Sequence, residues 1–451
     1  MLVSEVATVF GQSLLEGDAE FTAVSTDTRL INAGDLFIAL SGDNFDGHDY
    51  LDLAAEKGAV AAIVDRDVDT EIPTIQVKDT KLALGELATY WRQQLDLKVV
   101  GLTGSNGKTT VKEMLACILS EVGNVTATAG NFNNDIGLPL TLLKMKPEHD
   151  FAVIEMGANH AGEIAYLTRL TKPDVALLNN AGPAHLEGFG SLQGVADAKA
   201  EIFSGLKEGG VAIINLDDDF SDYWTSLCGD HKKIFFGLDE AADVSATVSI
   251  ENYSGAFQLN TTAGNIDIKL KVLGLHNLKN ALAASAVAIA MNVDVKSIAA
   301  GLGKFKGVNG RLQVNVAAND SLVIDDTYNA NPESVRAAMD VLAAQKMKSI
   351  FVLGDLGELG EGAEQLHADL GEYAKHKKIE SLFTLGELSS HAAKSFGENG
   401  VSYTEKEALI EDLKMKLNKE VAVLVKGSRS MHMEDVVTAL INKTKGPTSC
   451  C

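Results

Sequence analysis

The chain has 451 residues, of which 46% are hydrophobic and 22% charged, as in ordinary globular domains, and its length predicts roughly two to four of them. A formal net charge of −23 argues against nucleic acid as a partner, because the backbone phosphates would be repelled. The sequence has no signal-like start and no run of about 18 apolar residues, so we expect no membrane span and a cytoplasmic location.

The first unit predicted along the chain covers residues 1–82. Three short apolar runs are bounded by polar turns and are predicted to be strands: Asp35–Leu40, Ala59–Val64 and Thr74–Val77. Leu82–Leu95 has apolar residues at helical spacing and is expected to lead into the next unit. Residues 1–82 are therefore predicted to form a small α/β domain.

From residue 83 to residue 310, strands and helices alternate, which predicts a parallel sheet covered on both faces. The strand Val99–Leu102 is followed by a glycine-rich loop and then by a helix over Thr109–Val122. The later elements expected here are strands at Phe151–Glu155, Val175–Asn179 and Val211–Asn215, an antiparallel patch over Val244–Val272, and an apolar helix over Asn277–Met291.

Beyond a glycine-containing break at Gly307–Arg311, the alternation of strands and helices resumes. Strands are expected at Leu322–Asp325, Ser349–Leu353, Leu382–Leu385 and Val421–Val425. Residues 311–451 are predicted to form a separate α/β domain. The chain as a whole is therefore expected to be an α/β protein of three domains.

The loop between the strand Val99–Leu102 and the following helix has the pattern of a phosphate-binding loop. It consists of Thr103, Gly104, Ser105, Asn106, Gly107, Lys108, Thr109 and Thr110. Its glycines allow phosphates to approach the backbone, Lys108 would reach the β- and γ-phosphates, and Thr109 would bind Mg²⁺. Leu102 stands where the strict pattern has glycine, so a plain glycine-rich turn is the alternative. The loop alone does not distinguish a kinase, a GTPase, a motor and a ligase.

Three further residues are candidates for the same site. Glu155 ends a strand, where a carboxylate would face the nucleotide crevice and bind Mg²⁺. His185 follows the next strand in a loop that faces the same crevice. Lys199 lies in a helical stretch. Each residue also has a simpler interpretation. Glu155 could be a solvated carboxylate at a strand end, His185 a surface histidine, and Lys199 a solvated helix lysine.

Taken together, these motifs resemble the Mur ligases, the ATP-dependent amide-forming enzymes of peptidoglycan precursor synthesis. The matching segments, in chain order, are Thr103–Thr110, Glu155–Gly157, the His185 loop, the Lys199 helix, Gly274–Asn280, Gly310–Arg311 and Asp325–Pro332. They extend over essentially the whole chain.

The resemblance implies a UDP-sugar domain over residues 1–82, an ATP domain over 83–310 and a Rossmann-like closing domain over 311–451, with ATP and Mg²⁺ as cofactors. It implies that Lys199 carries a carbamate, so that the metal site would consist of Thr109, Glu155, His185 and modified Lys199. The expected catalytic residues are Lys108, Glu155, His185, Lys199 and Arg311.

The resemblance also implies the binding residues. Asn277 and Asn280 would hydrogen-bond to adenine. Arg311 would contact the phosphates of ATP and Asp326 its ribose, and Tyr328 would also lie at the ATP site. The residues expected to bind the substrates are Ser25, Thr26, Asp27, Thr28, Arg29, Asp46, Gly47 and His48 for the UDP end, Asn133 and Asn134 for the muramoyl-peptide, and Asn329, Asn331, Lys426, Ser428 and Arg429 for the acceptor. For each loop residue, ordinary turn chemistry is the alternative.

Four stretches favour the branch of the family that joins D-alanyl-D-alanine to a UDP-N-acetylmuramoyl-tripeptide through an acyl phosphate. They are Ser25–Arg29 with Gly34–Phe37, Thr128–Gly137, Gly354–Gly360 and Lys426–Ser430. A monomer is expected. The alternatives are a ligase that adds the third amino acid, a folylpolyglutamate synthase-like ligase, and a P-loop switch without ligase activity. The third residue of the tripeptide, lysine or diaminopimelate, stays open.

Overall fold

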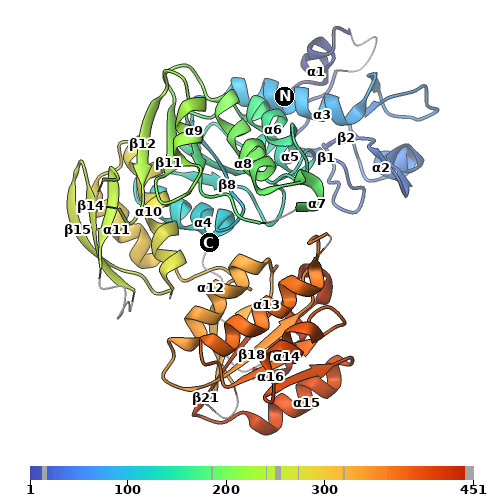
Figure 1. Ribbon diagram of the computed structural model, residues 1–451. Coiled ribbons are helices and arrows are strands. Elements are labelled where there is room, and N and C mark those ends of the chain that lie inside the picture. The colour runs from blue at the N-terminus through green and yellow to red at the C-terminus, as the bar shows by residue number, and fades with distance from the viewer. Residues whose placement is uncertain are drawn as a thin grey trace.

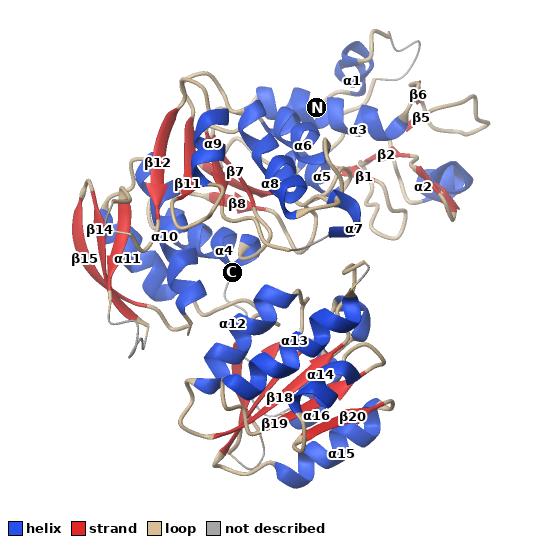
Figure 2. Cartoon of the chain, viewed as in Figure 1, coloured by secondary structure: helices blue, strands red, loops and turns tan. Residues whose placement is uncertain are grey.

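The structure is a computed structural model that describes residues 1–12, 18–183, 186–239, 241–248, 255–272, 274–317, 320–360 and 362–441. The predicted site residue His185 lies outside the described residues. Three α/β units follow one another along the chain, and Figures 1 and 2 show the C-terminal unit (orange to red in Figure 1) below the central unit, on the side of the phosphate-loop helix. The prediction of an α/β chain with three domains is confirmed.

The N-terminal unit is built on a parallel sheet with the strand order β1-β2-β5-β6. Alternate residues of its strands face two apolar layers, formed by α1 and α3 on one face and α2 on the other. Its elements are β1 (Val24–Ser25), β2 (Leu36–Ile38), β3 (Ser41–Gly42), β4 (Phe45–Asp46), β5 (Ala61–Val64), β6 (Thr74–Gln76), α1 (Val3–Val9), η1 (Gly47–Tyr50), α2 (Leu51–Glu56) and α3 (Thr80–Gln93).

The central unit has a sheet with the order β15-β14-β13-β12-β11-β10-β7-β9-β8. Its strands are β7 (Lys98–Thr103), β8 (Val125–Ala127), β9 (Phe151–Glu155), β10 (Val175–Leu178), β11 (Val211–Asn215), β12 (Lys232–Phe236), β13 (Val244–Thr247), β14 (Ala256–Thr261) and β15 (Gly264–Lys269). Its helices are α4 (Lys108–Leu119), α5 (Gly137–Leu143), α6 (Glu163–Thr171), α7 (Leu186–Phe189), α8 (Leu192–Ala200), η2 (Glu201–Gly205), α9 (Ser221–Leu227), α10 (Leu275–Ala290) and α11 (Val295–Lys304).

The helices cover both faces of the central sheet, as the strand–helix alternation predicts. On β7, Val100 and Leu102 pack with α4, α10 and α11, whereas Val99 packs with α5, α6 and α8 on the other face. The strands from β8 to β13 are parallel, so their carboxyl ends meet at one edge of the sheet. That edge is where the phosphate loop begins.

The predicted antiparallel patch is confirmed: β13 pairs antiparallel with β14, and β14 pairs antiparallel with β15. β13 also pairs in parallel with β12 through Phe236 and Val244. The patch therefore continues the central sheet. Residues 249–254, within the same predicted patch, lie outside the described residues.

The C-terminal unit has the strand order β16-β17-β21-β18-β19-β20, in which only β16 is antiparallel to its neighbour. Helices α12 to α14 cover one face, and α15 and α16 cover the other. Its elements are β16 (Gln313–Val316), β17 (Leu322–Asp326), β18 (Lys348–Gly354), β19 (Ser381–Leu385), β20 (Gly400–Tyr403), β21 (Val421–Lys426), α12 (Pro332–Ala343), α13 (Ala363–His376), α14 (Ser390–Phe396), α15 (Lys406–Lys416), η4 (Arg429–Met431) and α16 (Glu434–Leu440).

The division of the chain at residues 82 and 310 stays a prediction. Helix α3 runs through residue 82, and Ala83, Leu84 and Leu87 pack in the N-terminal core. Within the part of the chain that the structure describes, no helix is both long and apolar enough to cross a lipid bilayer.

Candidate active site

A cleft of about 1180 Å³ lies at the carboxyl ends of the central strands, and all three units contribute to its walls. The predicted site residues that line it are Ser105, Asn106, Gly107, Lys108, Thr110, Asn133, Asn134, Glu155, Asn277, Asn280, Arg311, Asp326, Tyr328, Asn329, Asn331, Lys426, Ser428 and Arg429. In an open α/β sheet, this edge is the usual place for a bound ligand.

The phosphate loop has the backbone geometry that an anion site requires. Gly107 has a φ of 80° and precedes the first residue of α4, so the amide groups of the helix start face the cleft. A Cβ on Gly107 would lie 2.3 Å from Oδ1 of Asn280, so any larger residue would displace that side chain. Behind the loop, the Thr103 hydroxyl donates to the Met156 carbonyl at 2.8 Å and fixes the end of β7.

Lys108 is folded back onto its own loop. Its Nζ donates to the carbonyl of Gly104 at 2.7 Å and to that of Ser105 at 3.3 Å. Burial lowers the pKa of Lys108, the negative charge of Glu155 opposes this shift, and the charge of Arg311 adds to it. Among the described residues, the ammonium group therefore has only neutral hydrogen-bond partners, which a phosphate oxygen could replace.

Glu155 is the last residue of β9, and its side chain is buried. Its Oε1 accepts a hydrogen bond of 2.8 Å from Nδ2 of Asn133, whereas Oε2 is buried without a hydrogen-bond partner among the described residues. A buried carboxylate oxygen without a partner is rare unless an ion or water binds it. Its position suits a hard cation such as Mg²⁺, although no group of three or more potential metal ligands occurs among the described residues.

Lys199 lies in the last turn of α8 and is 2% exposed. Its Nζ is 5.4 Å from the centre of the Phe189 ring. Burial, followed by the charge of Lys108, lowers the pKa of Lys199 to about 7, so a large share of this amine is neutral near neutral pH. The simpler interpretation of Lys199 as a solvated helix lysine is therefore wrong.

The predicted nucleotide residues meet across the boundary between the central and C-terminal units. Asn280 accepts a hydrogen bond from Asn179 at 3.3 Å and donates to Oδ1 of Asn277 at 3.5 Å. From the other unit, Arg311 donates to the Thr109 hydroxyl at 3.3 Å, and its guanidinium carbon lies 4.4 Å from the centre of the Tyr328 ring. The stacking on Tyr328 holds the guanidinium over the phosphate loop.

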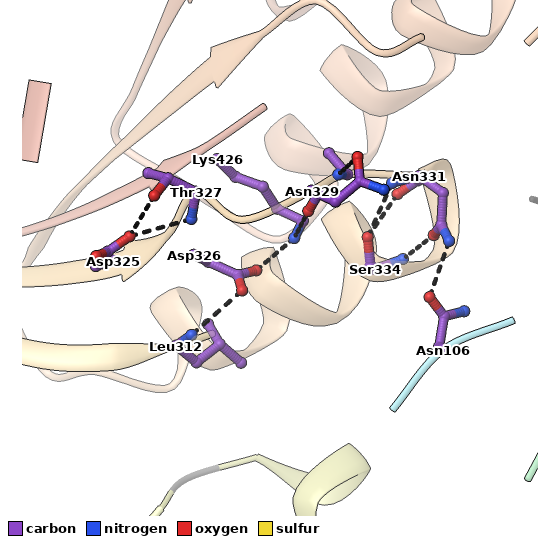
Figure 3. A network of polar contacts seen from close by, with 10 residues as sticks. Asn106, Leu312, Asp325, Asp326, Thr327, Asn329, Asn331, Ser334 and Lys426 are labelled. Carbon is purple, nitrogen blue, oxygen red and sulfur yellow. Dashed lines mark hydrogen bonds and ion pairs between the residues drawn. The ribbon is translucent and has the colours of Figure 1, made fainter. Parts of the chain in front are cut away.

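Asp326 and Lys426 form a buried ion pair at the carboxyl ends of two neighbouring strands (Figure 3). Lys426 Nζ lies 2.6 Å from Oδ2 of Asp326 and donates to the Asn329 carbonyl at 3.0 Å, while Oδ1 of Asp326 accepts from the Leu312 amide at 3.2 Å. Burial raises the pKa of Asp326, and the charge of Lys426 opposes that rise. In the structure, Asp326 and Lys426 therefore bind each other, whereas the family resemblance assigns Asp326 to the ribose of ATP and Lys426 to the acceptor.

The start of α12 contacts the phosphate loop directly, as Figure 3 shows for Asn331 and Asn106. Asn331 caps the helix by accepting from the Ser334 amide at 2.8 Å, and its Nδ2 donates to Oδ1 of Asn106 at 2.8 Å. Asn106 in turn donates to Oε2 of Glu333 at 2.8 Å. The C-terminal unit is thus hydrogen-bonded to the loop that would hold the phosphates.

Two other predicted acceptor residues, Ser428 and Arg429, also line the cleft. The Ser428 hydroxyl donates to the Asp355 carbonyl at 2.7 Å, and Arg429 pairs with Glu434 at 2.9 Å. Asn134, which also lines the cleft, accepts from the amide of Gly137, the first residue of α5, at 2.8 Å. The Arg429 side chain is 58% exposed, so this cation remains accessible to a ligand.

The predicted UDP-binding residues, from Ser25 to Arg29 and from Asp46 to His48, do not line this cleft. They lie in the N-terminal unit, where many of them are hydrogen-bonded or ion-paired to residues of the same unit. Arg29 Nε donates to Oδ1 of Asp27 at 2.9 Å, and the Thr28 carbonyl accepts from Lys57 at 2.7 Å.

A second set of these residues forms a closed polar cluster. His48 Nδ1 lies 2.7 Å from Asp46, its Nε2 lies 3.2 Å from Asp65, and Arg66 also pairs with Asp46. The hydrogen bonds from the His48 amide and from Arg66 hold the pKa of Asp46 well below its usual range. A Cβ on Gly47 would lie 2.7 Å from the Leu40 carbonyl, so glycine is required for packing.

Several cleft residues escape prediction from the sequence. Asn179 and Asn180 follow β10 and hold Asn106: Asn179 donates to its carbonyl at 2.9 Å, and Oδ1 of Asn180 accepts from its amide at 2.8 Å. His276 also lines the cleft, and burial together with the charge of Lys426 lowers its pKa to about 4. In the sequence, the only sign of such a role for Asn179 and Asn180 is that two adjacent polar residues lie at the end of a predicted strand.

Family models match three consecutive parts of the chain. Residues 20–92 match "Mur ligase family, catalytic domain", residues 102–288 match "Mur ligase middle domain", and residues 310–429 match "Mur ligase, glutamate ligase domain". The fold and the cleft together define an α/β P-loop enzyme.

Similar proteins narrow this class further. A protein of Escherichia coli strain K12 named UDP-N-acetylmuramoyl-tripeptide--D-alanyl-D-alanine ligase is 46% identical over 97% of this chain and 98% of its own length. A protein of the same name from Haemophilus influenzae is 43% identical, with 96% and 97% covered. The chain belongs to the Mur ligase family, which confirms the predicted resemblance.

Solved structures agree with this assignment. A crystal structure of MurF from Acinetobacter baumannii has a TM-score of 0.89 and 37% identity, covering 96% of this chain and 97% of that one. MurF ligase from Thermotoga maritima in complex with ADP has a TM-score of 0.83 and 31% identity, with 92% and 96% covered. A folylpolyglutamate synthase is only 16% identical, with a TM-score of 0.64, and shares the fold alone.

Proposed function

We propose that the central cleft joins D-alanyl-D-alanine to the carboxylate of a UDP-N-acetylmuramoyl-tripeptide with cleavage of ATP, the ligation for which the two relatives are named. The chain is accordingly an ATP-dependent ligase of peptidoglycan synthesis. The observation that carries this proposal is the meeting of three groups in one cleft. They are the phosphate loop with Lys108, the open carboxylate oxygen of Glu155, and Arg311 from the C-terminal unit.

The reaction must bring two anions together, since the tripeptide carboxylate attacks the γ-phosphorus of ATP. Lys108 would leave its own loop carbonyls and bind the β- and γ-phosphates, and Arg311 would neutralise charge from the opposite side. ADP is the leaving group, and the tripeptide carboxylate becomes an acyl phosphate. The amine of the dipeptide attacks its acyl carbon, and phosphate leaves as the amide forms.

We infer that Mg²⁺ is held by the Thr109 hydroxyl and by Oε2 of Glu155. The buried oxygen without a partner supports this assignment, because a divalent cation would satisfy it. When bound, the cation neutralises phosphate charge as a Lewis acid. His185, which lies outside the described residues, remains a predicted second ligand.

We further propose the carbamate on Lys199. A neutral amine attacks the carbon of CO₂, a C–N bond forms, and the nitrogen releases its proton. The pKa of about 7 supports this step, because a buried ammonium would not react. The resulting carboxylate supplies the oxygen ligand that a second Mg²⁺ prefers.

For the acceptor, we propose that Arg429 binds the terminal carboxylate of the dipeptide, with Ser428, Asn329 and Asn331 near it. The exposed guanidinium of Arg429 supports this choice. Lys426 and Asp326 would contribute only after their buried ion pair rearranges, so they fit better as a support for the Asn329 loop. The UDP end would bind the N-terminal loops Ser25–Arg29 and Asp46–His48, outside the cleft.

The test is a panel of acceptors. Purified protein with ATP, Mg²⁺ and UDP-N-acetylmuramoyl-tripeptide is supplied in turn with D-alanyl-D-alanine, diaminopimelate, lysine and glutamate, and amide formation is measured. We expect product with the dipeptide alone. Product with a single amino acid instead would reject the proposal in favour of a sister ligase. The monomeric state, the cytoplasmic location and the third residue of the tripeptide stay predictions.

A further inference from the structure

Lys112 is a buried cation beneath the phosphate loop that the reaction scheme does not use. It lies one turn into α4, after Lys108 and Thr109, and is 1% exposed. Its Nζ donates to the Thr128 carbonyl at 2.6 Å and pairs with Oε1 of Glu113 at 2.9 Å. A lysine is almost never fully buried unless it is paired and hydrogen-bonded, because the loss of hydration is costly.

The residue that Lys112 holds is linked to Glu155. Thr128 follows β8, and its amide donates to the Val153 carbonyl at 3.0 Å. Its hydroxyl accepts a hydrogen bond of 2.9 Å from the amide of Glu155. One end of Thr128 is therefore fixed by the phosphate-loop helix, and the other end fixes the backbone of the carboxylate residue.

The same loop also orients the Glu155 side chain. Asn133, five residues after Thr128, donates to Oε1 of Glu155 at 2.8 Å, and its carbonyl accepts from the Gly157 amide at 2.9 Å. Because Oε1 is occupied by this amide, Oε2 is the carboxylate oxygen that has no hydrogen-bond partner in the described part of the chain. A Cβ on Gly157 would lie 2.9 Å from Oδ1 of Asn133, so the asparagine is closely packed against the strand end.

These contacts form a continuous path from α4 through the loop of residues 128–133 to Glu155. We propose that Lys112 is a positioning residue: from the phosphate-loop helix it anchors Thr128, and through Thr128 and Asn133 it fixes Glu155 with Oε2 open. The placement of the carboxylate is thereby tied to the helix that carries the phosphate loop. Partners that orient a metal ligand typically change metal affinity or activity by about 10–100-fold when removed. This inference rests on the proposed role of Glu155 toward Mg²⁺.

The first experiment compares Lys112→Met with the parent chain. Binding of ADP is measured by calorimetry with and without Mg²⁺, and amide hydrogen exchange is measured for residues 128–137 and 153–157 in metal-free protein. In the variant we expect ADP binding without Mg²⁺ to stay within about twofold, the tightening by Mg²⁺ to fall about tenfold or more, and exchange at the Glu155 amide to accelerate.

A second pair of variants guards against a simple folding defect. Thr128→Val removes the hydroxyl that accepts from Glu155 and keeps the shape of the side chain, whereas Thr128→Ser keeps the hydroxyl. We expect Thr128→Val to lose the Mg²⁺ effect on ADP binding, as Lys112→Met does. We expect Thr128→Ser to retain most of that effect. With substrates, both Lys112→Met and Thr128→Val should lower kcat more than they raise KM for ATP.

Arg92→Met is the matched control. Arg92 is 4% exposed and, like Lys112, donates to backbone carbonyls, those of Thr171 at 3.3 Å and Leu95 at 3.2 Å. This variant should lower the melting temperature and leave the Mg²⁺ effect on ADP binding unchanged. An equal loss of the Mg²⁺ effect in Arg92→Met would overturn the inference.

The remaining outcomes separate this inference from the proposed function. If the parent chain shows no Mg²⁺ effect on ADP binding, the metal assignment of Glu155 fails, and the inference that depends on it fails with it. If the parent shows the effect and folded Lys112→Met and Thr128→Val retain it in full, the positioning role of Lys112 is rejected while the metal assignment stands.

Discussion

The central cleft and the loops of the N-terminal unit are both rich in polar residues, but these residues are partnered differently. In the cleft, Oε2 of Glu155 has no partner among the described residues, and Lys108 is held only by neutral carbonyls. In the N-terminal unit, Asp46 receives hydrogen bonds from Ser41, His48 and Arg66. Strong charges without matching partners are therefore concentrated where ATP would react.

This difference separates two ways in which a polar residue contributes. A group that is left open, or that is held by neutral carbonyls alone, can turn to a reacting ligand without losing a counter-charge, so its removal should affect rate more than stability. A group that is already satisfied maintains the shape of its loop, so its removal should affect stability first. The following four substitutions test this division, two through catalytic rate and then two through stability, each pair from the larger expected effect to the smaller.

Lys108→Ala should lower the rate of ligation by about 1000-fold or more, because it removes the cation that would bind the transferred phosphoryl group. The melting temperature should stay close to that of the parent, since the hydrogen bonds of Lys108 Nζ within the described residues all go to carbonyls of its own loop. Lys98→Ala is the control, because this exposed lysine begins the same strand, β7, at its far end. Ligation at the parent rate by Lys108→Ala would reject the assignment of the phosphate loop.

Lys199→Ala should lower ligation by roughly 100-fold, and added acetate or another short carboxylic acid should restore part of the rate by replacing the carbamate. In the parent, only the neutral amine reacts with CO₂. Because the pKa of Lys199 is lowered to about 7, stimulation by bicarbonate should increase as the pH rises through 7. Steady-state rates at a series of pH values measure this, and a lack of rescue by any carboxylic acid would count against the carbamate.

Asp326→Asn should destabilise the protein by about 3–5 kcal/mol, because it leaves Lys426 buried without its counter-charge. The double variant Asp326→Leu with Lys426→Met should regain most of that stability, since neither charge is then left unpaired. Unfolding by urea measures the stability of both variants. If Asp326→Asn were as stable as the parent, the ion pair would not stabilise the cleft wall.

Asp46→Ala should destabilise the protein by about 1 kcal/mol at pH 7, because Asp46 caps η1 through the His48 amide. The folded-state pKa of Asp46 is depressed, so its contribution is present above the ordinary value of 3.8 and is lost as the pH falls below it. The difference between parent and variant should therefore shrink in acid. Unfolding at pH 7 and pH 3 checks this, and a constant difference would contradict the linkage.

The sequence predicts the parallel core well, because buried strands and their following loops have strong local signals. Phe151–Glu155 and Val211–Asn215 are strands with the predicted bounds. The prediction misses β8, a strand of only three half-buried residues, and β16, a short edge strand whose valines, Val314 and Val316, are exposed.

The site is predicted less completely, because pairing depends on distant segments. Lys112 looks like an ordinary helix lysine, and only its contact with the Thr128 carbonyl shows that it is buried and engaged. Likewise, the ion pair of Asp326 and Lys426 joins residues 100 positions apart in the sequence, on strands that pair in parallel. Local sequence cannot show which of the predicted ligand-binding residues are paired with one another in the folded protein.

Phosphate release by the parent chain tests the central claim most directly. It is measured with ATP, Mg²⁺ and UDP-N-acetylmuramoyl-tripeptide, in the presence and absence of D-alanyl-D-alanine. If the cleft is a ligation site, sustained phosphate release requires both substrates, and one phosphate appears for each amide formed. Sustained release that is indifferent to both substrates would identify the cleft as a simple ATPase and contradict the account.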